Sequence, residues 1–113
     1  LAPGYVGKTC IGNLVKGTRD GKAREVFIYN VCDHVEAFAE VGSQAISYTA
    51  GVPATAAALL IADGTWDVQR MVNVEELPCR PFIDLLGRMG LPTHVREAGQ
   101  GEDLLLEFEA EAA

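Results

Sequence analysis

Two apolar segments joined by a tight-turn sequence constrain the fold of this chain most strongly. Residues 9–16 and 24–32 are rich in β-branched, aromatic and other apolar side chains, a composition that is typical of strands. The sequence between them, GTRDGK at positions 17–22, contains an Asp-Gly pair, which favours a tight reversal of the chain. The pattern therefore predicts an antiparallel hairpin over residues 9–32.

The second strand of this hairpin has two apolar faces. Because side chains alternate along a strand, one face carries Val26, Ile28, Asn30 and Cys32, and the other carries Phe27, Tyr29 and Val31. A strand that is apolar on both faces is usually covered on both. We therefore expect helices or a partner chain over each face, and a homodimer through the face of Phe27, Tyr29 and Val31.

Glycine and proline positions divide the next part of the chain into helices. A short helix is predicted from Val35 to Val41, ending at Gly42. A second helix is predicted over about residues 53–62, because Pro53 would cost nothing at a first helical position but would remove a hydrogen bond inside a helix. The residues before Pro53 form either a kinked upstream helix or an extended approach, and we favour the kinked helix.

The C-terminal third of the chain contains one more clear helix. It is predicted from Pro81 to Met89, where apolar residues recur at the i, i+3, i+4 and i+7 positions of one face. Gly90 then supplies a left-handed stop, and Pro92 prevents continuation. Residues 93–97 are predicted to form a last strand. The fold class is therefore α+β, with an antiparallel or mixed sheet (hairpin 9–32 plus the C-terminal strand) packed against two or three helices.

The composition changes after Gly99. Residues 102–113 contain five acidic residues and no basic one, and their apolar side chains alternate with acidic ones. This period of two favours an edge strand, and a partly disordered acidic tail is the equally weighted alternative. The structural domain is accordingly predicted to end near residue 98.

Charge and cysteine content limit the function classes. A net charge of −7 and a pI near 4.7 argue against a nucleic-acid partner, which would need a basic surface, and fit an anionic membrane poorly. The three cysteines include no CxxC pair, which is typical of reduced thiols in the cytoplasm. We also expect no membrane span, because the longest apolar run, residues 54–62, is half the necessary length.

The sequence Cys32-Asp33-His34 is the first candidate for chemistry. A thiol and an imidazole two residues apart could form a metal site or a nucleophilic pair, but the remaining ligands Cys10, Cys79 and His94 are isolated in the sequence. We therefore expect no metal, and interpret these residues as a polar strand end that lines a cleft. Neither a GxSxG nucleophile motif nor a GxGxxG or Walker loop occurs in the chain.

Four segments of the sequence indicate a family. They are GKTCIG (7–12), YNVCDH (29–34), EVGSQAISYTAGVPA (40–54) and PFIDLLGRMGLP (81–92). Over roughly residues 7–95 the chain resembles the C-terminal part of the carboxynorspermidine dehydrogenases, which are members of the saccharopine dehydrogenase superfamily. The GSQAISYT-x-GVPA run is the most specific element of this resemblance, and the wider superfamily has a looser Thr-x-Gly-x-Pro element at the equivalent place.

The resemblance implies an NAD(P)-dependent oxidoreductase of polyamine biosynthesis. Family members condense aspartate β-semialdehyde with a diamine, either diaminopropane or putrescine, and reduce the resulting Schiff base with hydride from the nicotinamide. The cofactor is bound by an N-terminal Rossmann domain, which these 113 residues do not contain. The resemblance then implies that the chain is part of the substrate and dimerisation domain and that its partner is its own Rossmann domain. The chain is expected to bind no cofactor itself and not to be catalytically competent alone.

The resemblance also implies where the site lies. Gln44, Tyr48 and Thr49 are expected in a cleft, with Asp33 and His34 at its mouth. Thr49, Gly51 and Pro53 are expected near the cofactor. No catalytic residue is implied at a matching position. The alternative interpretation of each residue is helix packing or capping.

Three alternatives stay open at this point. The chain could belong to a saccharopine-dehydrogenase-like enzyme of lysine metabolism, or it could be a non-catalytic dimerisation or binding module. Metal-dependent hydrolysis at Cys32 and His34 would require bound metal in elemental analysis. The dehydrogenase hypothesis predicts that the genomic reading frame upstream of Leu1 encodes a strand–GxGxxG–helix unit.

Overall fold

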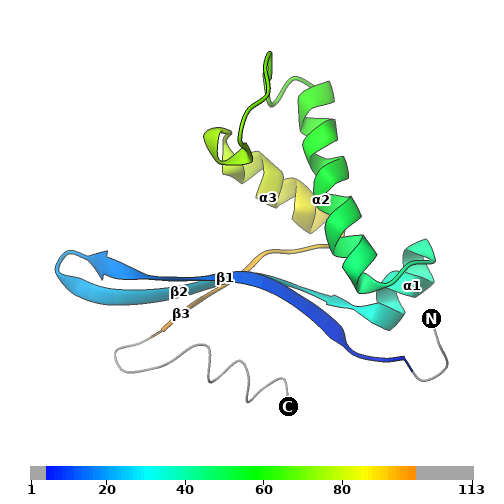
Figure 1. Cartoon of the computed structure of the whole chain (residues 1–113), viewed down its shortest axis with the longest axis horizontal. Helices are drawn as coiled ribbons and strands as arrows, with labels where there is room; N and C mark the ends of the chain where they lie inside the picture. Colours follow the sequence, from blue (N-terminus) through cyan, green and yellow to red (C-terminus); the bar gives the residue numbers. More distant parts are fainter. Residues whose placement is uncertain (1–4, 99–113) are drawn as a thin grey trace. The chain divides into compact units, whose positions relative to one another are not determined.

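The computed structural model describes residues 5–98. These residues form two compact units, a helical unit made of residues 5–9 and 31–93 and a sheet unit made of residues 10–30 and 94–98. Residues 5–98 contain three antiparallel strands and three α-helices (Figure 1), so the predicted α+β fold is confirmed. The predicted edge strand or disordered tail, residues 99–113, lies outside the described residues.

The predicted hairpin is present and is longer than expected. Strand β1 spans Lys8–Arg19 and β2 spans Lys22–Asp33. The two residues between them, Asp20 and Gly21, have φ angles of 54° and 74°. Positive φ at both central residues is the signature of a type I′ turn, whose twist matches that of the flanking strands. The Asp-Gly pair therefore determines where this hairpin reverses.

A short third strand completes the sheet. Strand β3, His94–Glu97, pairs antiparallel with β2, with His94 opposite Tyr29 and Val95 opposite Ile28. The strand order is β1-β2-β3. The predicted last strand is thus confirmed, and β2 is central while β1 and β3 lie at the two edges.

Gly12 identifies the two faces of the sheet. A Cβ atom placed on Gly12 would lie 2.6 Å from the Cβ of Tyr29 and 2.8 Å from the Phe27 ring, so Gly12 lies on the aromatic face. By alternation, Ile11 and Val15 lie on the opposite face. The Phe27 and Tyr29 rings stack with centroids 4.7 Å apart, which half-buries the aromatic face. A homodimer through Phe27, Tyr29 and Val31 stays a prediction.

Helices α1 and α3 follow the predicted pattern closely. Helix α1, His34–Val41, ends at Gly42, whose φ of 69° is left-handed. Helix α3, Cys79–Arg88, begins two residues before the predicted start at Pro81. Pro81 is tolerated there because the first N–H groups of a helix have no intrahelical acceptor. Gly90, with a φ of 85°, ends this segment as predicted.

Helix α2 differs from the prediction of a helix that starts at Pro53. It runs from Ala45 to Ala62 with Pro53 inside it, so the favoured alternative of helix upstream of Pro53 is confirmed, and its kink stays a prediction. An interior proline costs about 3 kcal/mol relative to alanine, because it lacks the N–H that would bond to the carbonyl of Thr49. Burial of Tyr48 and Leu60 on this helix offsets that cost, so packing decides where the helix starts.

The length of α2 also corrects the expectation that no apolar segment reaches the length of a membrane span. Its 18 residues have a mean hydropathy of 1.5, which is long and apolar enough to cross a bilayer by length and composition alone. The earlier expectation failed because it ended the apolar run at Pro53. Core helices of water-soluble proteins meet the same two criteria.

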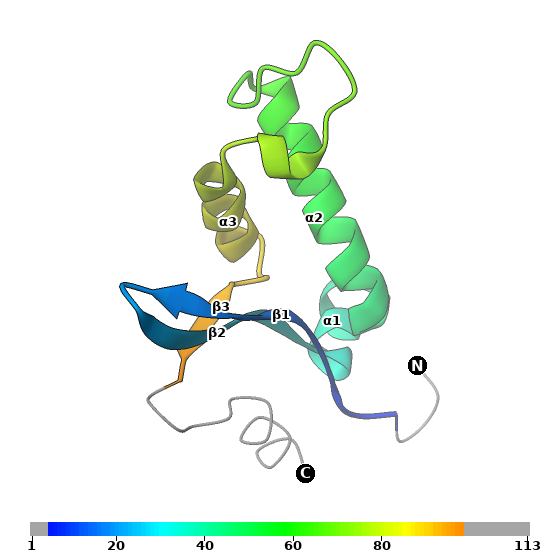
Figure 2. The same ribbon diagram turned by 60° about the vertical axis from the view of Figure 1, so that its left-hand side comes forward.

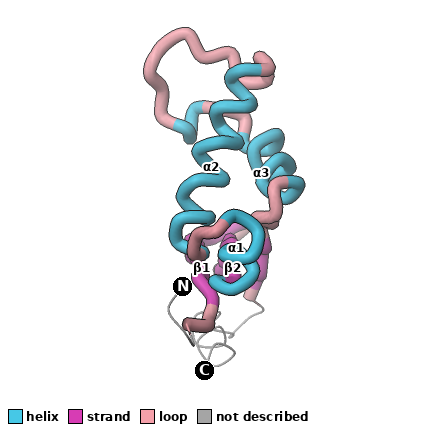
Figure 3. Tube along the Cα trace, turned by 90° about the vertical axis from the view of Figure 1, so that its right-hand side faces the viewer, coloured by secondary structure: helices cyan, strands magenta, loops and turns pink. Residues whose placement is uncertain are grey.

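The helical unit has a small core between its helices. Helix α2 packs against both α1 and α3 (Figure 2). One cluster contains Cys32, Ala37, Ala45, Tyr48 and Leu91. Beyond the end of α2, a loop leads to the short 3₁₀ helix η1, Val74–Glu76 (Figure 3). Trp66 anchors this loop, because its indole N–H donates to the Pro78 carbonyl at 3.0 Å and its ring stacks on Phe82.

The contact of Gly12 with β2 makes a stability prediction. We expect Gly12→Ala to lower the free energy of unfolding by about 2 kcal/mol, because the added methyl group overlaps the Tyr29 Cβ, which cannot rotate away. Urea unfolding followed by circular dichroism measures this. Gly17→Ala is the matched control on the same strand, since nothing lies within 4 Å of its added methyl group, and it should change stability by less than about 0.5 kcal/mol. Equal effects of the two substitutions would contradict the prediction.

Candidate functional site

The junction of β2, α1 and α2 brings together four of the predicted site residues. Asp33 ends β2, His34 begins α1, Gln44 precedes the first residue of α2, and Tyr48 lies one turn into that helix. All four belong to the helical unit. A hydrogen bond from the backbone N–H of Ala45 to the His34 ring thus makes neighbours of predicted cleft residues that are ten or more positions apart in the sequence.

Asp33 caps helix α1. Its Oδ1 atom accepts hydrogen bonds from the backbone N–H groups of Glu36 and Val35, at 3.1 and 2.8 Å. These two bonds hold the pKa of the Asp33 carboxyl below its usual range. An aspartate cap satisfies backbone donors that have no partner inside the helix and complements the helix dipole. The local structure therefore gives Asp33 a capping role.

His34 is buried and connects three segments. Its Nδ1 accepts the backbone N–H of Ala45 at 3.2 Å, and its own backbone N–H donates to the Gly7 carbonyl at 3.0 Å. Because Nδ1 accepts a hydrogen bond, the ring proton lies on Nε2, which is 3.5 Å from the Thr9 hydroxyl. Gln44 makes no side-chain cap, so His34 supplies the acceptor that the start of α2 needs. Its role at a cleft mouth stays a prediction.

Tyr48 joins α1, α2 and the end of α3. Its hydroxyl oxygen lies 3.1 and 3.2 Å from the two carboxylate oxygens of Glu40 and 2.9 Å from the Met89 carbonyl. A phenol has one proton, so it donates to one of these acceptors at a time. Burial, and then the neighbouring Glu40 carboxylate, raise the pKa of Tyr48. Tyr48 is therefore a neutral hydrogen-bond donor at physiological pH.

A cavity of about 80 Å³ lies beside the Tyr48 hydroxyl. It is lined by Val31, Cys32, Asp33, Glu36, Ala37, Glu40, Tyr48 and Gly90. Burial, together with the nearby carboxylates, raises the pKa of the Cys32 thiol. A thiol in such surroundings stays protonated and is a poor nucleophile. The cavity therefore offers neutral and anionic hydrogen-bonding groups and no activated nucleophile.

The residues expected near the cofactor lie further along α2. The Thr49 hydroxyl donates to the Ile46 carbonyl at 3.2 Å, and Pro53 leaves the Thr49 carbonyl without its usual backbone donor. Gly51 is exposed, and nothing lies within 4 Å of the position that a side chain would take. None of the three lines the cavity beside Tyr48. The structure thus separates them from the Asp33–Tyr48 cluster.

Helix α2 presents an uncharged surface. It contains no charged residue over its 18 positions, and Ile46, Leu59 and Ile61 on it are 57%, 48% and 46% exposed. A helix that is apolar on all sides is normally buried on all sides. The free side of α2 is therefore an unpartnered surface of the helical unit.

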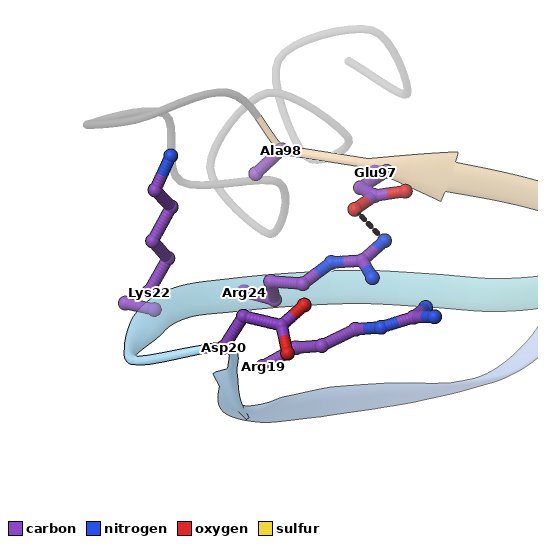
Figure 4. Close-up of a pocket in the computed structure, with 7 residues that line it drawn as sticks. Arg19, Asp20, Lys22, Arg24, Glu97 and Ala98 are labelled. Carbon is purple, nitrogen blue, oxygen red and sulfur yellow. Dashed lines mark hydrogen bonds and ion pairs between the residues drawn. The ribbon is translucent and has the colours of Figure 1, made fainter.

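A larger hollow than the cavity beside Tyr48 lies in the sheet unit, at the tip of the hairpin. Its volume is about 530 Å³, and it is lined by Arg19, Asp20, Lys22, Ala23, Arg24, Glu97 and Ala98 (Figure 4). The Arg24 guanidinium forms an ion pair with the Glu97 carboxylate (Figure 4). None of the predicted site residues lines this hollow.

The residues of this chain do not fit a dinucleotide cofactor or a metal ion by themselves. No glycine-rich phosphate loop precedes a helix within residues 5–98. Within residues 5–98, no three His, Cys, Asp or Glu side chains lie close enough to hold one metal ion. The hydrolytic hypothesis for Cys32 and His34 therefore gains no support from the donor set.

The sequence patterns missed several residues that line the cavity beside Tyr48. Glu40 and Gly90 both line the cavity, and Gly90 was predicted only as a helix stop. A Cβ on Gly90 would lie 2.6 Å from the Tyr48 hydroxyl oxygen. The contact of Tyr48 with residues 40 and 89 joins different helices, so no periodicity in the sequence signals it.

A family model and several known proteins match most of this chain. The family model described as the saccharopine dehydrogenase C-terminal domain matches residues 3–91. The chain is 53% identical over 94 residues to the carboxyaminopropylagmatine dehydrogenase of Synechocystis, covering 83% of this chain and 24% of that protein. It is 49% identical over 105 residues to the carboxynorspermidine synthase of Vibrio alginolyticus, covering 93% and 25%, and 49% identical over 102 residues to that of Vibrio cholerae, covering 90% and 25%. The chain thus spans about a quarter of the length of these relatives.

The effect on stability of the close approach between Gly90 and Tyr48 can be measured separately from the effect of the left-handed backbone conformation of Gly90. Gly64 has a similar φ of 79° and nothing within 4 Å, so Gly64→Ala measures the left-handed strain alone, about 1 kcal/mol. We expect Gly90→Ala to lower the free energy of unfolding by about 1–3 kcal/mol more. In a Tyr48→Phe background this excess should disappear, because the overlapping hydroxyl is gone. An unchanged excess in that background would show that the hydroxyl is not its cause.

The raised pKa of Tyr48 predicts a pH dependence of stability. The protonated phenol is retained to a higher pH in the folded chain than in the unfolded chain. Its contribution is therefore complete below the pKa of an unfolded tyrosine, about 10, and is lost as the pH rises through the folded value. We expect Tyr48→Phe to be less stable than wild type at neutral pH and to lose less stability above about pH 10. Parallel stability curves for the two proteins, from urea unfolding at each pH, would exclude this linkage.

Proposed function

Because the chain belongs to the saccharopine dehydrogenase C-terminal domain family, we propose that it is the C-terminal part of an NAD(P)-dependent oxidoreductase of polyamine biosynthesis. The observation that carries this proposal is the identity of 49–53% over 83–93% of the chain to relatives with two related names. Both names denote a carboxylated amine product, and one of the two is a dehydrogenase. The proposed substrate is accordingly the Schiff base of aspartate semialdehyde and an amine.

The proposed cofactor, NAD(P)H, is bound mainly by an N-terminal Rossmann domain outside these residues. The absence of a glycine-rich loop from the 113 residues supports this division. The chain by itself is then not catalytically competent. Its contribution is to position and enclose the substrate, a function that requires fixed hydrogen-bonding groups more than ionisable ones.

Within this chain, we assign substrate contacts to the predicted cleft residues Gln44, Tyr48 and Thr49, of which Tyr48 alone lines the cavity. Tyr48 supports the assignment best, because it is a neutral donor beside a cavity that two carboxylates of α1 also line. A neutral hydroxyl can orient an imine or carboxylate without an unpaired buried charge. Asp33 and His34 hold the starts of α1 and α2 in place around it.

The partner of α2 in this proposal is the protein's own cofactor-binding domain. The free side of the helix has no charge, and Gly51 on it allows another backbone to approach closely. If the cofactor-binding domain buries that side, the high hydropathy of α2 is explained without a membrane span. The proposed enzyme is cytoplasmic, forms a homodimer, and has neither a nucleic-acid nor a membrane partner, in keeping with its net charge of −7.

The experiment that tests the proposal uses the full-length protein encoded by the gene. NADPH and NADH oxidation is measured with aspartate semialdehyde and each of diaminopropane, putrescine and agmatine, the last taken from the name of the Synechocystis relative. We expect oxidation only when the semialdehyde and one amine are both present. Activity on saccharopine alone would assign the chain to lysine metabolism, and a lack of any activity would favour a binding module.

The assignment of α2 to a domain contact makes a separate prediction. Gly51→Glu should lower kcat/KM of the full-length enzyme at least about tenfold, because a carboxylate in a dry contact costs more than about 1.4 kcal/mol. The isolated chain should not lose stability, since Gly51 is exposed and glycine is a poor helix former. Gly87→Glu is the matched control, because Gly87 is also an exposed helical glycine with nothing within 4 Å. Equal kcat/KM for Gly51→Glu and wild type would remove the contact from the proposal.

A further inference from the structure

The surroundings of the Tyr48 hydroxyl limit where its single proton can point. Both oxygens of the Glu40 carboxylate lie within hydrogen-bonding distance of the phenol oxygen, and the Met89 carbonyl lies at 2.9 Å. Gly90 closes another side, because a Cβ on it would lie 2.6 Å from the phenol oxygen. The cavity of about 80 Å³ that Tyr48 lines is the remaining neighbour. The direction of the proton therefore decides what Tyr48 offers to that cavity.

The two acceptors of Tyr48 differ in charge and in position. The Met89 carbonyl is the nearer one, but it is a neutral backbone group just after α3. Hydrogen bonds to a charged acceptor such as the Glu40 carboxylate are about twice as strong as bonds between neutral groups. Glu40 also lines the cavity, whereas Met89 does not. A proton held by Glu40 thus stays beside the cavity, and a proton held by Met89 points into the backbone.

No cation of the described residues competes with Tyr48 for the Glu40 carboxylate. Within residues 5–98, Glu40 takes part in none of the ion pairs, and helix α1 has no basic residue in its last turn. The other titratable groups that line the cavity are Cys32 and Asp33 at the end of β2 and Glu36 on α1. None of these three forms a hydrogen bond with the phenol. Glu40 is therefore the one charged group of this cavity that acts directly on the Tyr48 proton.

We propose that Glu40 is the positioning residue of Tyr48, whose carboxylate holds the phenol proton on the cavity side and away from the Met89 carbonyl. This inference rests on the proposed function, because it concerns the contact of Tyr48 with the substrate. An acceptor atom of the substrate, such as an imine nitrogen or a carboxylate oxygen, then replaces Glu40 as the partner of the phenol O–H group. Because residue 40 is exposed, the displaced carboxylate is solvated by water, which limits the cost of the exchange.

A substitution that removes the charge of Glu40 and keeps its shape should reverse the direction of the proton. In Glu40→Gln the side chain is neutral, and its amide N–H group can itself donate to the phenol oxygen. The nearer Met89 carbonyl then accepts the phenol proton. The cavity is left with a lone pair of Tyr48 in place of its O–H group. Glu40→Gln is thus expected to act as a loss of the Tyr48 donor.

A double-mutant cycle on the full-length enzyme measures whether Glu40 acts through Tyr48. Glu40→Gln, Tyr48→Phe and the double variant are compared by NADPH oxidation with aspartate semialdehyde and the accepted amine. We expect each single substitution to lower kcat/KM about five- to tenfold, the size of effect that one hydrogen bond has. The double variant should equal Tyr48→Phe within about twofold, because the two residues act as one unit. Glu75→Gln is the control, since it removes an exposed carboxylate outside the cavity, and it should leave kcat/KM unchanged.

The titration of Tyr48 provides a measurement that needs no activity. Burial raises the pKa of Tyr48 most, and the hydrogen bond and charge of Glu40 raise it further. Full-length protein labelled with ¹³C at the tyrosine Cζ is titrated by NMR, and the resonance that is missing in Tyr48→Phe identifies Tyr48. We expect Tyr48 to titrate at a lower pH in Glu40→Gln than in wild type. Glu36→Gln is the matched control, because Glu36 lines the same cavity without a bond to the hydroxyl, and it should lower the pKa less.

Three results would overturn the inference. One is a loss of kcat/KM in Glu40→Gln that is equally large with and without the Tyr48 hydroxyl, which would show that Glu40 acts by another route. Another is an active Glu40→Gln enzyme with the kcat/KM of wild type. The third is an unchanged titration of Tyr48 in Glu40→Gln, which would show that Glu40 does not hold the proton. A full-length protein that does not oxidise NADPH or NADH with any of these substrates would overturn the proposed function instead, and the titration would still decide the role of Glu40.

Discussion

The packing of the helical unit depends on the hydrogen bonds of the Tyr48 hydroxyl. This hydroxyl lies within hydrogen-bonding distance of Glu40 at the end of α1 and of the Met89 carbonyl after α3. Its ring also belongs to the small core with Ala45 and Leu91. One side chain therefore fixes the spacing of three helices, and Gly90 must remain without a side chain so that the hydroxyl fits. Few large side chains are buried in this unit, so the loss of one such contact weakens a large share of its packing.

Helix α2 shows a conflict between local preference and tertiary packing. It contains Gly51, Pro53 and several β-branched residues, all of which lower helix propensity. Such conflicts concentrate at surfaces that serve a function. The same helix has an uncharged free side and starts at the His34 hydrogen bond to Ala45. These features fit the domain contact that we propose for this helix.

The turn residues of this protein were predictable because each has one physical requirement. Asp20-Gly21 had to adopt positive φ, and Gly42 and Gly90 had to end helices in the left-handed region. The resemblance of GSQAISYT-x-GVPA to one superfamily was also correct, since the family match covers residues 3–91. The start of α2 was not predictable in the same way. Pro53 argues for a helix start locally, and only the burial of Tyr48 and Leu60 overrides it.

The sequence by itself determined the strands, the helix ends and the family of this protein, because backbone geometry and alternation depend on neighbouring residues. The tertiary structure alone decided what the site residues do. Cys32 and His34 suggested a possible nucleophilic pair in the sequence, yet hydrogen bonds make His34 and its neighbour Asp33 the caps of α2 and α1. Tyr48 meets Glu40 and Gly90 only after three helices have packed. Contacts between side chains that are distant in the chain leave no periodic trace, so their chemistry appears only in three dimensions.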